Sequence, residues 1–353
     1  MPNSKSLGGR QVLYPPRPTV GVGGHMGVSL FDTRPKEDRS LLYGRGTELD
    51  EIGRTLDSGF WPLLIGAPRV GKTSLMKVIV KERKGLYVDA STSTTAADLG
   101  TRLLDELQGG KLKAAVEFDF KLLKVELKRE PVRTLEKVMK GMGGALIAID
   151  EAQNLNDSRI PGLLSVLYNE SRVKLMFSGS MLRLIKLIDR SPQTLGRPIQ
   201  KMEIIPFAED VGREFLKKGF KECGVETDNA ELGEVAKALG GIPGWLSYYG
   251  ARRCGRSSQS TALRQVRASA KKVIEEEVNR LGPLEQAIVR SLAMIGFGEW
   301  KRIMALATSF YGKEPDRKSL TRSLASLLDM RIVDKTNDGY RLIDPMYRIL
   351  ESS

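Results

Sequence analysis

The sequence is poor in the residues that build metal clusters and disulfide frameworks. Its 353 residues include two cysteines, Cys223 and Cys254, and one histidine, His25. Because the cysteines lie far apart in the chain, we expect neither a disulfide framework nor a zinc cluster, and any metal must be held by oxygen ligands. His25 lies in the glycine-rich stretch GVGGHMG, which is typical of an exposed tail, so we assign it no role.

Long apolar runs and acidic charge are also scarce. No run approaches the roughly 20 residues that a membrane-spanning helix needs, and the start, MPNSKSLGGR, lacks the apolar segment of a signal peptide. This predicts a folded cytoplasmic protein with no membrane partner. Lysine and arginine number 56 against 43 acidic residues, and the resulting net charge of +13 favours polyanionic partners.

Glycine- and proline-rich segments divide the chain into four parts. Residues 1–40 lack helical or strand periodicity, which predicts an extended N-terminal arm. In residues 41–206 short apolar strands alternate with amphipathic helices, the pattern of a mainly parallel α/β sheet, and the predicted strands are FWPLLIG, GLYVDA, ALIAID, KLMFSG and KMEIIPF. Residues 207–277 predict a helical lid. Residues 278–353 carry three helical patterns and a hairpin at IVDKTNDGYRLID, which predicts a winged helix-turn-helix.

The stretch GAPRVGKTS, Gly66 to Ser74, joins a predicted strand to a predicted helix. It satisfies the phosphate-loop pattern Gly-x-x-x-x-Gly-Lys-Ser/Thr in the context that the pattern requires. Gly66 and Gly71 let the backbone curl around phosphate, Lys72 adds charge at the outer phosphates, and the Thr73 hydroxyl is a ligand for Mg²⁺. The other loop residues expected at the nucleotide are Ala67, Pro68, Arg69, Val70 and Ser74. ATP and Mg²⁺ are therefore the predicted ligands.

A second motif, ALIAIDEAQNL, ends a buried strand in two adjacent carboxylates, Asp150 and Glu151. Successive residues at a strand end point in different directions. Asp150 can therefore face the Mg²⁺ shell while Glu151 faces a water aligned with the γ-phosphate and accepts its proton. This pairing predicts hydrolysis as well as binding.

These motifs resemble those of the archaeal ATPases, a family of P-loop ATPases of the AAA+ and STAND type, over nearly the whole chain after the arm. The likeness rests on LLYGRGTELDEI, GAPRVGKTSL and IAIDEAQ, which occur in the family's order. It implies an α/β fold in which a P-loop ATPase core with a parallel sheet is followed by a helical lid and a C-terminal winged helix.

Further segments extend the resemblance to individual residues. KLMFSGS resembles the family's Gly-Ser strand end, which implies that Ser178 and Ser180 sense the γ-phosphate, and SPQTLGRPI resembles its arginine motif, which implies that Arg197 stabilises charge during phosphoryl transfer. GGIPGWL resembles the family's Gly-x-Pro element, which implies that Pro243 lies near the base. The segment YRLIDPMYRIL resembles its wing.

The chain departs from most AAA+ proteins in two ways. Serine replaces the usual sensor asparagine, and no clear second-sensor arginine follows the GGIPG turn, with Arg252 and Arg253 the nearest substitutes. We therefore expect slow, switch-like turnover rather than motor cycling. Arg197 could act within its own subunit or on the nucleotide of a neighbour in a homo-oligomer.

The segment DRKSLTRSLASLLDMRIV is expected to form a helix with two different faces. One face is apolar and carries Leu320, Leu324, Leu327 and Leu328; the other is small, polar and basic and carries Lys318, Thr321, Arg322 and Ala325. The second face suits a recognition helix in the major groove of duplex DNA. The run Arg252 to Lys272, with seven basic residues and no acidic one, is either a solvated face or a further DNA contact through Arg252, Arg253 and Arg256.

Two functions remain open from the sequence. In the first, an ATP-hydrolysing switch couples its nucleotide state to DNA binding or nucleoprotein assembly, as in replication initiators, which the layout also resembles. In the second, a STAND-type signalling ATPase uses its winged helix to bind a protein.

Overall fold

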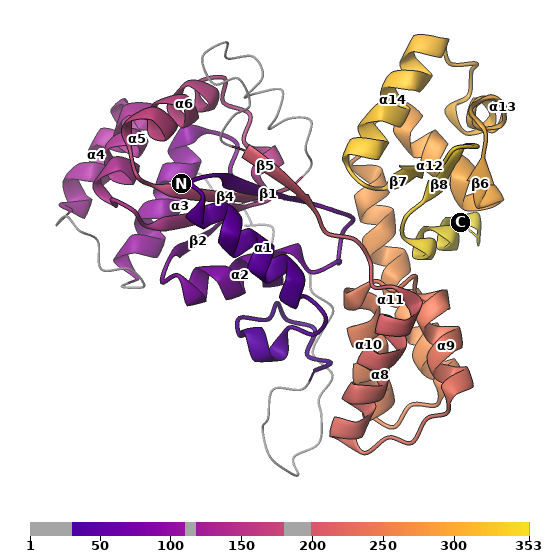
Figure 1. Ribbon diagram of the computed structural model, residues 1–353. Helices are drawn as coiled ribbons and strands as arrows, with labels where there is room; N and C mark the ends of the chain where they lie inside the picture. The colour runs from indigo at the N-terminus through magenta and orange to yellow at the C-terminus, as the bar shows by residue number, and fades with distance from the viewer. Residues whose placement is uncertain (1–29, 110–117, 180–198, 353) are drawn as a thin grey trace, which may run out of the picture.

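The computed structural model describes residues 30–109, 118–179 and 199–352 (Figure 1). Its central sheet has five parallel strands in the order β2-β3-β4-β1-β5. The strands are β1 (Trp61–Ile65), β2 (Leu86–Asp89), β3 (Leu146–Asp150), β4 (Lys174–Ser178) and β5 (Ile199–Glu203). Because all five are parallel, the loops that follow β1, β3 and β4 meet at one edge, where α/β proteins bind their ligands.

All five predicted strands are present, with shifted ends. The largest shift is in β5, which begins two residues before KMEIIPF and stops at Glu203. The amide of Ile204 still donates to the carbonyl of Ile65, at 2.7 Å, but Pro206 has no N–H to continue the ladder.

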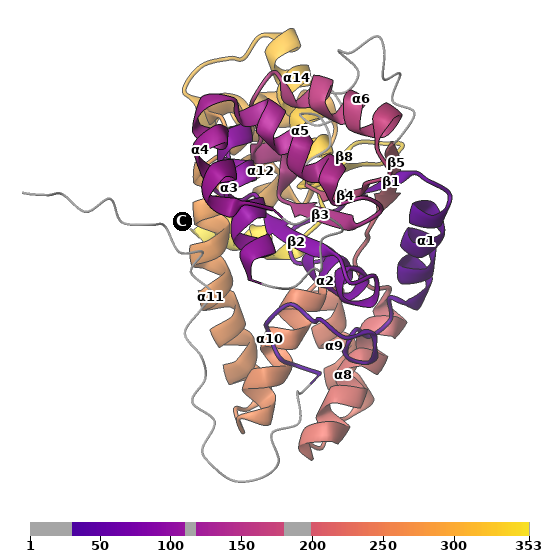
Figure 2. The ribbon, with the colours of Figure 1, turned by 90° about the vertical axis from the view of Figure 1, so that its left-hand side faces the viewer.

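Helices cover both faces of the sheet and give it two hydrophobic cores (Figure 2). One face packs on α1 (Gly46–Asp57) and α2 (Lys72–Glu82). The helices on the other face are α3 (Ala96–Gln108), α4 (Phe120–Arg129), α5 (Pro131–Gly141) and α6 (Ile160–Glu170). The first core is continuous with the apolar interior of the C-terminal half.

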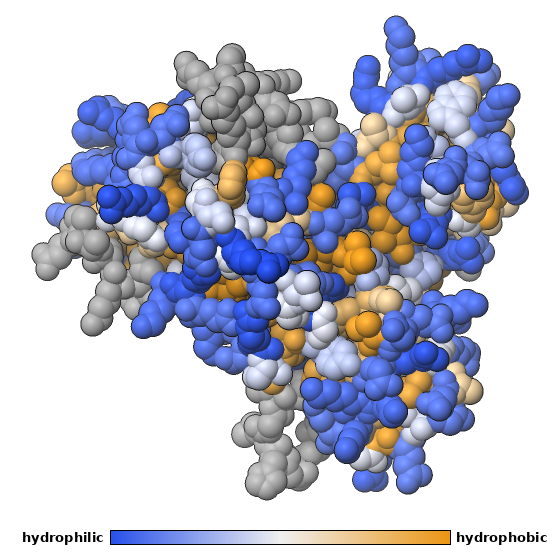
Figure 3. Space-filling model, in the orientation of Figure 1, coloured by the Kyte–Doolittle hydropathy of each residue, from blue (hydrophilic) through white to orange (hydrophobic). Residues whose placement is uncertain are grey.

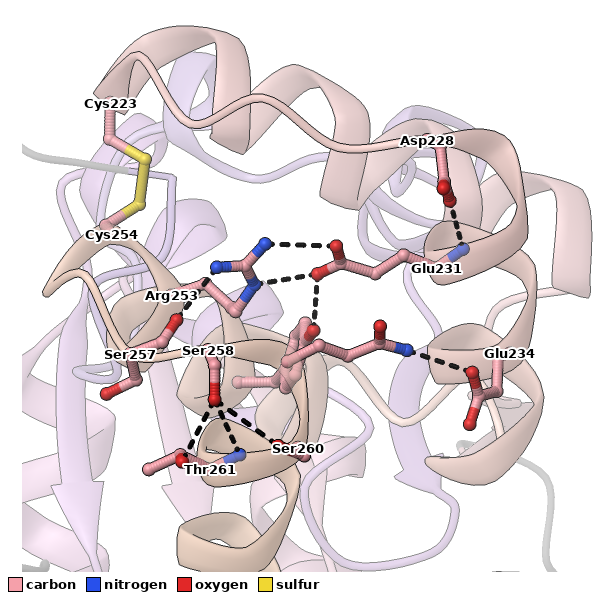
Figure 4. Close-up of polar contacts among 12 residues, drawn as sticks. Cys223, Asp228, Glu231, Glu234, Arg253, Cys254, Ser257, Ser258, Ser260 and Thr261 are labelled. Carbon is pink, nitrogen blue, oxygen red and sulfur yellow. Dashed lines mark hydrogen bonds and ion pairs between the residues drawn. A yellow bond between two sulfur atoms is a disulfide. The ribbon is translucent and has the colours of Figure 1, made fainter.

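The lid consists of α8 (Glu209–Cys223), α9 (Asn229–Ala238) and α10 (Pro243–Cys254). A disulfide joins the last residues of α8 and α10, Cys223 and Cys254, whose Cα atoms lie 5.8 Å apart (Figure 4). The expectation of no disulfide is therefore wrong. The cysteines are distant in sequence, but α9 returns the chain so that α8 and α10 pack directly on each other with their last residues at the same end. Closing a loop of this length stabilises a fold by about 3.5 kcal/mol in the chain-entropy model.

The long helix α11 (Gln259–Asn279) leads from the lid to the C-terminal domain (Figure 2). That domain contains the predicted helices and hairpin and one short additional strand, which completes a three-stranded antiparallel sheet in the order β6-β8-β7. Its elements are α12 (Pro283–Ile295), β6 (Phe297–Gly298), α13 (Trp300–Tyr311), α14 (Arg317–Asp329), β7 (Val333–Lys335), β8 (Tyr340–Leu342) and the 3-10 helix η3 (Pro345–Ser352). None of the helices in the described ranges combines the length and apolar character that a bilayer crossing requires.

Candidate active site

The predicted phosphate loop connects β1 to α2 as the pattern requires. Gly71 has φ +106°, and a Cβ at Gly66 would lie 2.3 Å from the carbonyl oxygen of Ile204, so both glycines are needed for the path of the backbone. The ammonium of Lys72 donates to the carbonyl oxygens of Gly66 at 2.8 Å and Ala67 at 2.9 Å. Burial lowers the pKa of Lys72, and the carboxylates of Glu151 and Asp150 oppose that change.

The carboxylate of Asp150, at the end of β3, is buried beside the loop. The hydroxyls of Thr73 and Tyr87 both donate to its Oδ2, each at 2.7 Å. The Ser178 hydroxyl and the Glu151 amide donate to its Oδ1. Four donors from four places in the chain thus hold one carboxylate and fix its orientation.

Glu151 follows Asp150 in a left-handed backbone conformation, with φ +55°. Its Oε2 accepts a hydrogen bond of 2.6 Å from the side-chain amide of Gln153. Burial, and then repulsion from Asp150, raise the pKa of Glu151, whereas the bond from Gln153 lowers it. A raised pKa makes the carboxylate a better proton acceptor, as a general base requires.

The resemblance assigned three residues near the γ-phosphate. Ser178 lies in the Asp150 cluster, where its hydroxyl donates to Asp150 and accepts from the Glu151 amide at 3.3 Å. Ser180 and Arg197 lie outside the described residues. The structure thus joins Ser178 to Asp150 and Glu151, and all three assigned roles stay predictions.

The side chain of Arg69 leaves the loop and reaches the C-terminal half of the chain. Its guanidinium lies 4.4 Å from the ring centre of Trp245 in α10 and forms ion pairs with Glu277 at the end of α11 and, at 3.6 Å, with Asp344. Asp344 is fully buried and also accepts a bond of 2.8 Å from the Trp245 indole. Tyr347 donates to Glu277 at 2.9 Å. We call Arg69, Trp245, Glu277, Asp344 and Tyr347 the junction cluster.

A phosphate loop that carries a lysine and a threonine beside a strand ending in two carboxylates is the site of a nucleotide hydrolase. Residues 42–249 of the chain match the family described as an ATPase domain predominantly from Archaea. The chain belongs to this family. The match covers the sheet, the phosphate loop, the carboxylates and most of the lid, and the protein is therefore a P-loop ATPase that binds and hydrolyses ATP.

Solved structures extend the likeness of this archaeal-type ATPase beyond the family region. The Walker-type ATPase paby2304 of Pyrococcus abyssi is 27% identical, with a TM-score of 0.79 over 91% of this chain and 99% of that one. The ORC2 protein of Aeropyrum pernix, solved as ADPNP-ADP complexes, is 15% identical, with a TM-score of 0.62 over 91% of this chain and 95% of that one. At this identity the second likeness shows the fold alone. No functionally curated protein matches the chain.

Two residues of the ATPase site were not predicted. Tyr87, in β2, reaches Asp150 because β2 and β3 are paired in register with Asp89 opposite Asp150. Arg45 is buried in the segment LLYGRGTELDEI, and its Nη2 donates to the carbonyls of Val70 at 3.0 Å and Ile205 at 2.7 Å. Arg45 thus ties the phosphate loop to the connection between β5 and the lid.

Some of the candidate DNA contacts are exposed to solvent, and others are bound to neighbouring side chains. On α14, Lys318, Thr321 and Arg322 are exposed as predicted. Of the four leucines predicted on the apolar face, Leu320, Leu324 and Leu327 are buried and Leu328 is half-buried. In the described part of the chain, Lys318 and Arg322 form no ion pair.

The basic run, by contrast, does not form one continuous surface, because a turn at Gly255 separates α10 from α11. Arg253 forms a two-point ion pair with Glu231 of α9 (Figure 4), and Arg252 donates to the Tyr248 hydroxyl at 2.6 Å. Arg256 is exposed. Arg252 and Arg253 therefore bind parts of the lid, and only Arg256 of the three faces solvent.

Proposed function

We propose that this ATPase is a molecular switch in which nucleotide on the phosphate loop sets the position of the C-terminal domain, and thereby its affinity for duplex DNA. The observation that carries the proposal is the junction cluster. Arg69 belongs to the loop that cradles phosphate, yet its guanidinium is bound by carboxylates of α11 and the C-terminal domain. The side chain of Arg69 therefore connects the phosphate loop to the C-terminal domain.

The chemistry of Arg69 suits such a role. Its Nη1 is buried and, among the described residues, has no hydrogen-bond partner. Phosphate oxygens on the loop compete with Glu277 and Asp344 for the same guanidinium, because arginine binds carboxylate and phosphate with the same fork of donors. A ligand that draws Arg69 toward the loop weakens the contacts that hold the C-terminal domain, so the two positions of that domain bind nucleotide differently.

The interface between the core and the C-terminal domain leaves room for movement. A cavity of about 460 Å³ lies between the phosphate loop, the connection after β5 and the hairpin strands of the C-terminal domain. Ile205 in its wall is 58% exposed, and Figure 3 shows apolar surface in the strip between the two parts. Arg331 bridges the strip to Glu203 at 2.7 Å. Such a partly packed interface resembles those of domains that move relative to each other.

Hydrolysis follows from the groups around Asp150. Thr73 and Asp150 are the hard oxygen donors that Mg²⁺ prefers, and a bound Mg²⁺ would neutralise charge on the phosphates. Lys72 places further positive charge at the loop, and the side chains of Tyr87 and Ser178 keep Asp150 in one orientation. Glu151 accepts the proton of the attacking water. In this proposal Ser180 is a γ-phosphate sensor, Arg197 stabilises the developing charge and Pro243, at the start of α10, lies near the base.

The DNA-binding surface in this proposal is the exposed face of α14, with Lys318, Thr321 and Arg322, extended by Arg256. When exposed lysine and arginine side chains contact DNA phosphates, they displace the cations condensed there, so binding through this face is salt-dependent. We test it by titrating nonspecific duplex DNA over a salt series. With ATP present and hydrolysis blocked by Glu151→Gln, affinity is expected to exceed that of the nucleotide-free protein. Lys318→Ala combined with Arg322→Ala should reduce the salt slope by about two units.

A matched control removes the same charge from another exposed helix: Lys121→Ala with Lys128→Ala on α4 should leave the slope unchanged. Arg69→Gln should retain both ligands but lose the effect of ATP on DNA affinity. Absence of DNA binding at low salt would refute the DNA role. It would favour the signalling ATPase, in which the C-terminal domain binds a protein and the junction cluster holds the ATPase inactive.

A further inference from the structure

Residues 30–38, which we call the strap, lack helix and strand but bind the lid tightly at one end. The ring of Phe31 is 2% exposed and lies 5.6 Å from the ring of Phe215 and 5.1 Å from that of Phe220, centre to centre. The amide of Leu30 donates to the Glu222 carboxylate at 3.0 Å. The predicted N-terminal arm therefore ends in a segment with a defined binding site on α8 and α10.

That binding site is a notch made by two glycines inside helices. A Cβ at Gly219 of α8 would lie 2.2 Å from Phe31, and one at Gly250 of α10 would lie 2.4 Å from it. Both glycines have ordinary helical backbone, so the ring of Phe31 alone excludes a larger residue. Glycine is less favourable than alanine in a helix interior, and its presence in both helices opposite one ring indicates a dedicated site for that ring.

The other end of the strap binds the phosphate loop and its helix. The amide of Lys36 donates to the Ser74 hydroxyl at 3.1 Å, inside the loop. Glu37 and Asp38 pair with Lys77 and Lys81 of α2. These exposed pairs contribute little by themselves, but they set the direction of the strap across α2.

The lid contacts the same loop independently, because the amide of Gly244 donates to the carbonyl of Arg69 at 3.1 Å. Loop, strap and lid therefore form a closed ring of contacts, with the lid bound at Arg69 in the middle of the loop and the strap bound at Ser74 at its end. The lid also meets the core through Tyr43, whose ring lies 5.6 Å from that of Phe215, through Arg69 over Trp245, and through the chain that follows β5. Swinging the lid away from the loop therefore requires the strap to leave one of its two attachments, the notch or α2.

We infer that Phe31 is a positioning residue for nucleotide retention: its insertion into the Gly219–Gly250 notch holds the lid on the phosphate loop, and nucleotide leaves only when the strap undocks. This inference rests on nucleotide binding at the loop but is independent of what the C-terminal domain binds. Burying a phenylalanine ring stabilises the closed lid enough that Phe31→Ala should speed dissociation of a fluorescent ADP analogue by about ten- to a hundredfold. Single-turnover hydrolysis of bound ATP should stay close to the parent rate.

The deciding experiment uses Gly250→Ala in two backgrounds. With Phe31 present, the added methyl blocks the notch and should speed dissociation. With Phe31→Ala, the notch is empty and alanine favours the helix, so the same substitution should have no effect or slow dissociation. This reversal would distinguish an effect that depends on Phe31 in its notch from a general loss of lid stability. Arg34→Ala is the matched control, because Arg34 is exposed and its ion-pair partner among the described residues, Asp32, also lies within the strap.

Phe31→Leu, which keeps an apolar plug, provides a folded intermediate if Phe31→Ala does not fold. Unchanged dissociation in either Phe31 variant, or equal damage from Gly250→Ala in both backgrounds, would overturn the inference. Failure of the parent protein to bind the analogue would instead refute the nucleotide site itself, and a lost ATP effect on DNA with normal retention would refute only the coupling.

Discussion

Charged side chains at the carboxyl edge of the sheet are held by hydrogen bonds, whereas those on the exposed face of α14 are in contact with solvent. At the sheet edge four donors are bound to the single carboxylate of Asp150. On α14 the cations of Lys318 and Arg322 extend into solvent. The first region has its geometry before any ligand arrives, which is what a reaction site needs, because preorganised groups lose nothing to rearrangement during the reaction. The exposed face of α14, by contrast, acts only when a partner binds it.

The sharpest test of this difference is Glu151→Gln, which should reduce turnover by about 10²- to 10⁴-fold, the usual contribution of a general base. The amide keeps the size of the side chain but cannot accept the water's proton. ATP binding, measured by calorimetry, and DNA affinity should both survive, since neither uses that proton acceptor. Turnover at the parent rate would assign water activation to another residue.

Arg253 forms an ion pair inside the lid, whereas Arg322 is exposed on α14. Replacing each arginine removes the same charge from these two different settings. Arg253→Gln breaks a largely buried pair with Glu231 and should cost about 2 to 4 kcal/mol in unfolding free energy, with no change in the salt slope of DNA binding. Arg322→Gln should change stability by less than about 0.5 kcal/mol and the slope by about 0.9. Denaturant titration and DNA titration of both variants decide the matter. A reduced slope for Arg253→Gln would contradict its structural assignment.

The smallest expected effect concerns pH. Glu151 must be ionised to act as a base, so activity falls as the pH drops through its pKa. The hydrogen bond from Gln153 stabilises the ionised form and lowers that pKa. Gln153→Ala should therefore move the acid limb of the kcat profile to higher pH and leave the alkaline side unchanged. A limb that stays in place, measured alongside Glu151→Gln, would show that a different group controls it.

Local pattern predicted structure well wherever a feature lies in consecutive residues. The phosphate loop, the Asp150-Glu151 pair and the two faces of α14 were predicted because each lies within one strand, loop or helix, where the periodicity of the backbone decides which side chains share a face. Arg252 and Arg253 were predicted as DNA contacts from the density of basic residues alone. In the fold, Arg252 binds Tyr248 and Arg253 binds Glu231, which no local pattern could indicate.

The sequence by itself determined the nucleotide chemistry of this ATPase and the α/β order of its core, because turns, strands and helices are short-range properties. Only the tertiary structure decided that Tyr87 serves Asp150, that Arg69 meets Asp344, that Phe31 fills a notch in the lid and that Cys223 bonds Cys254. Each of these pairs is separated by 31 to 275 residues. Closing such distances depends on how whole elements pack, and no periodicity within a window of a few turns contains that information.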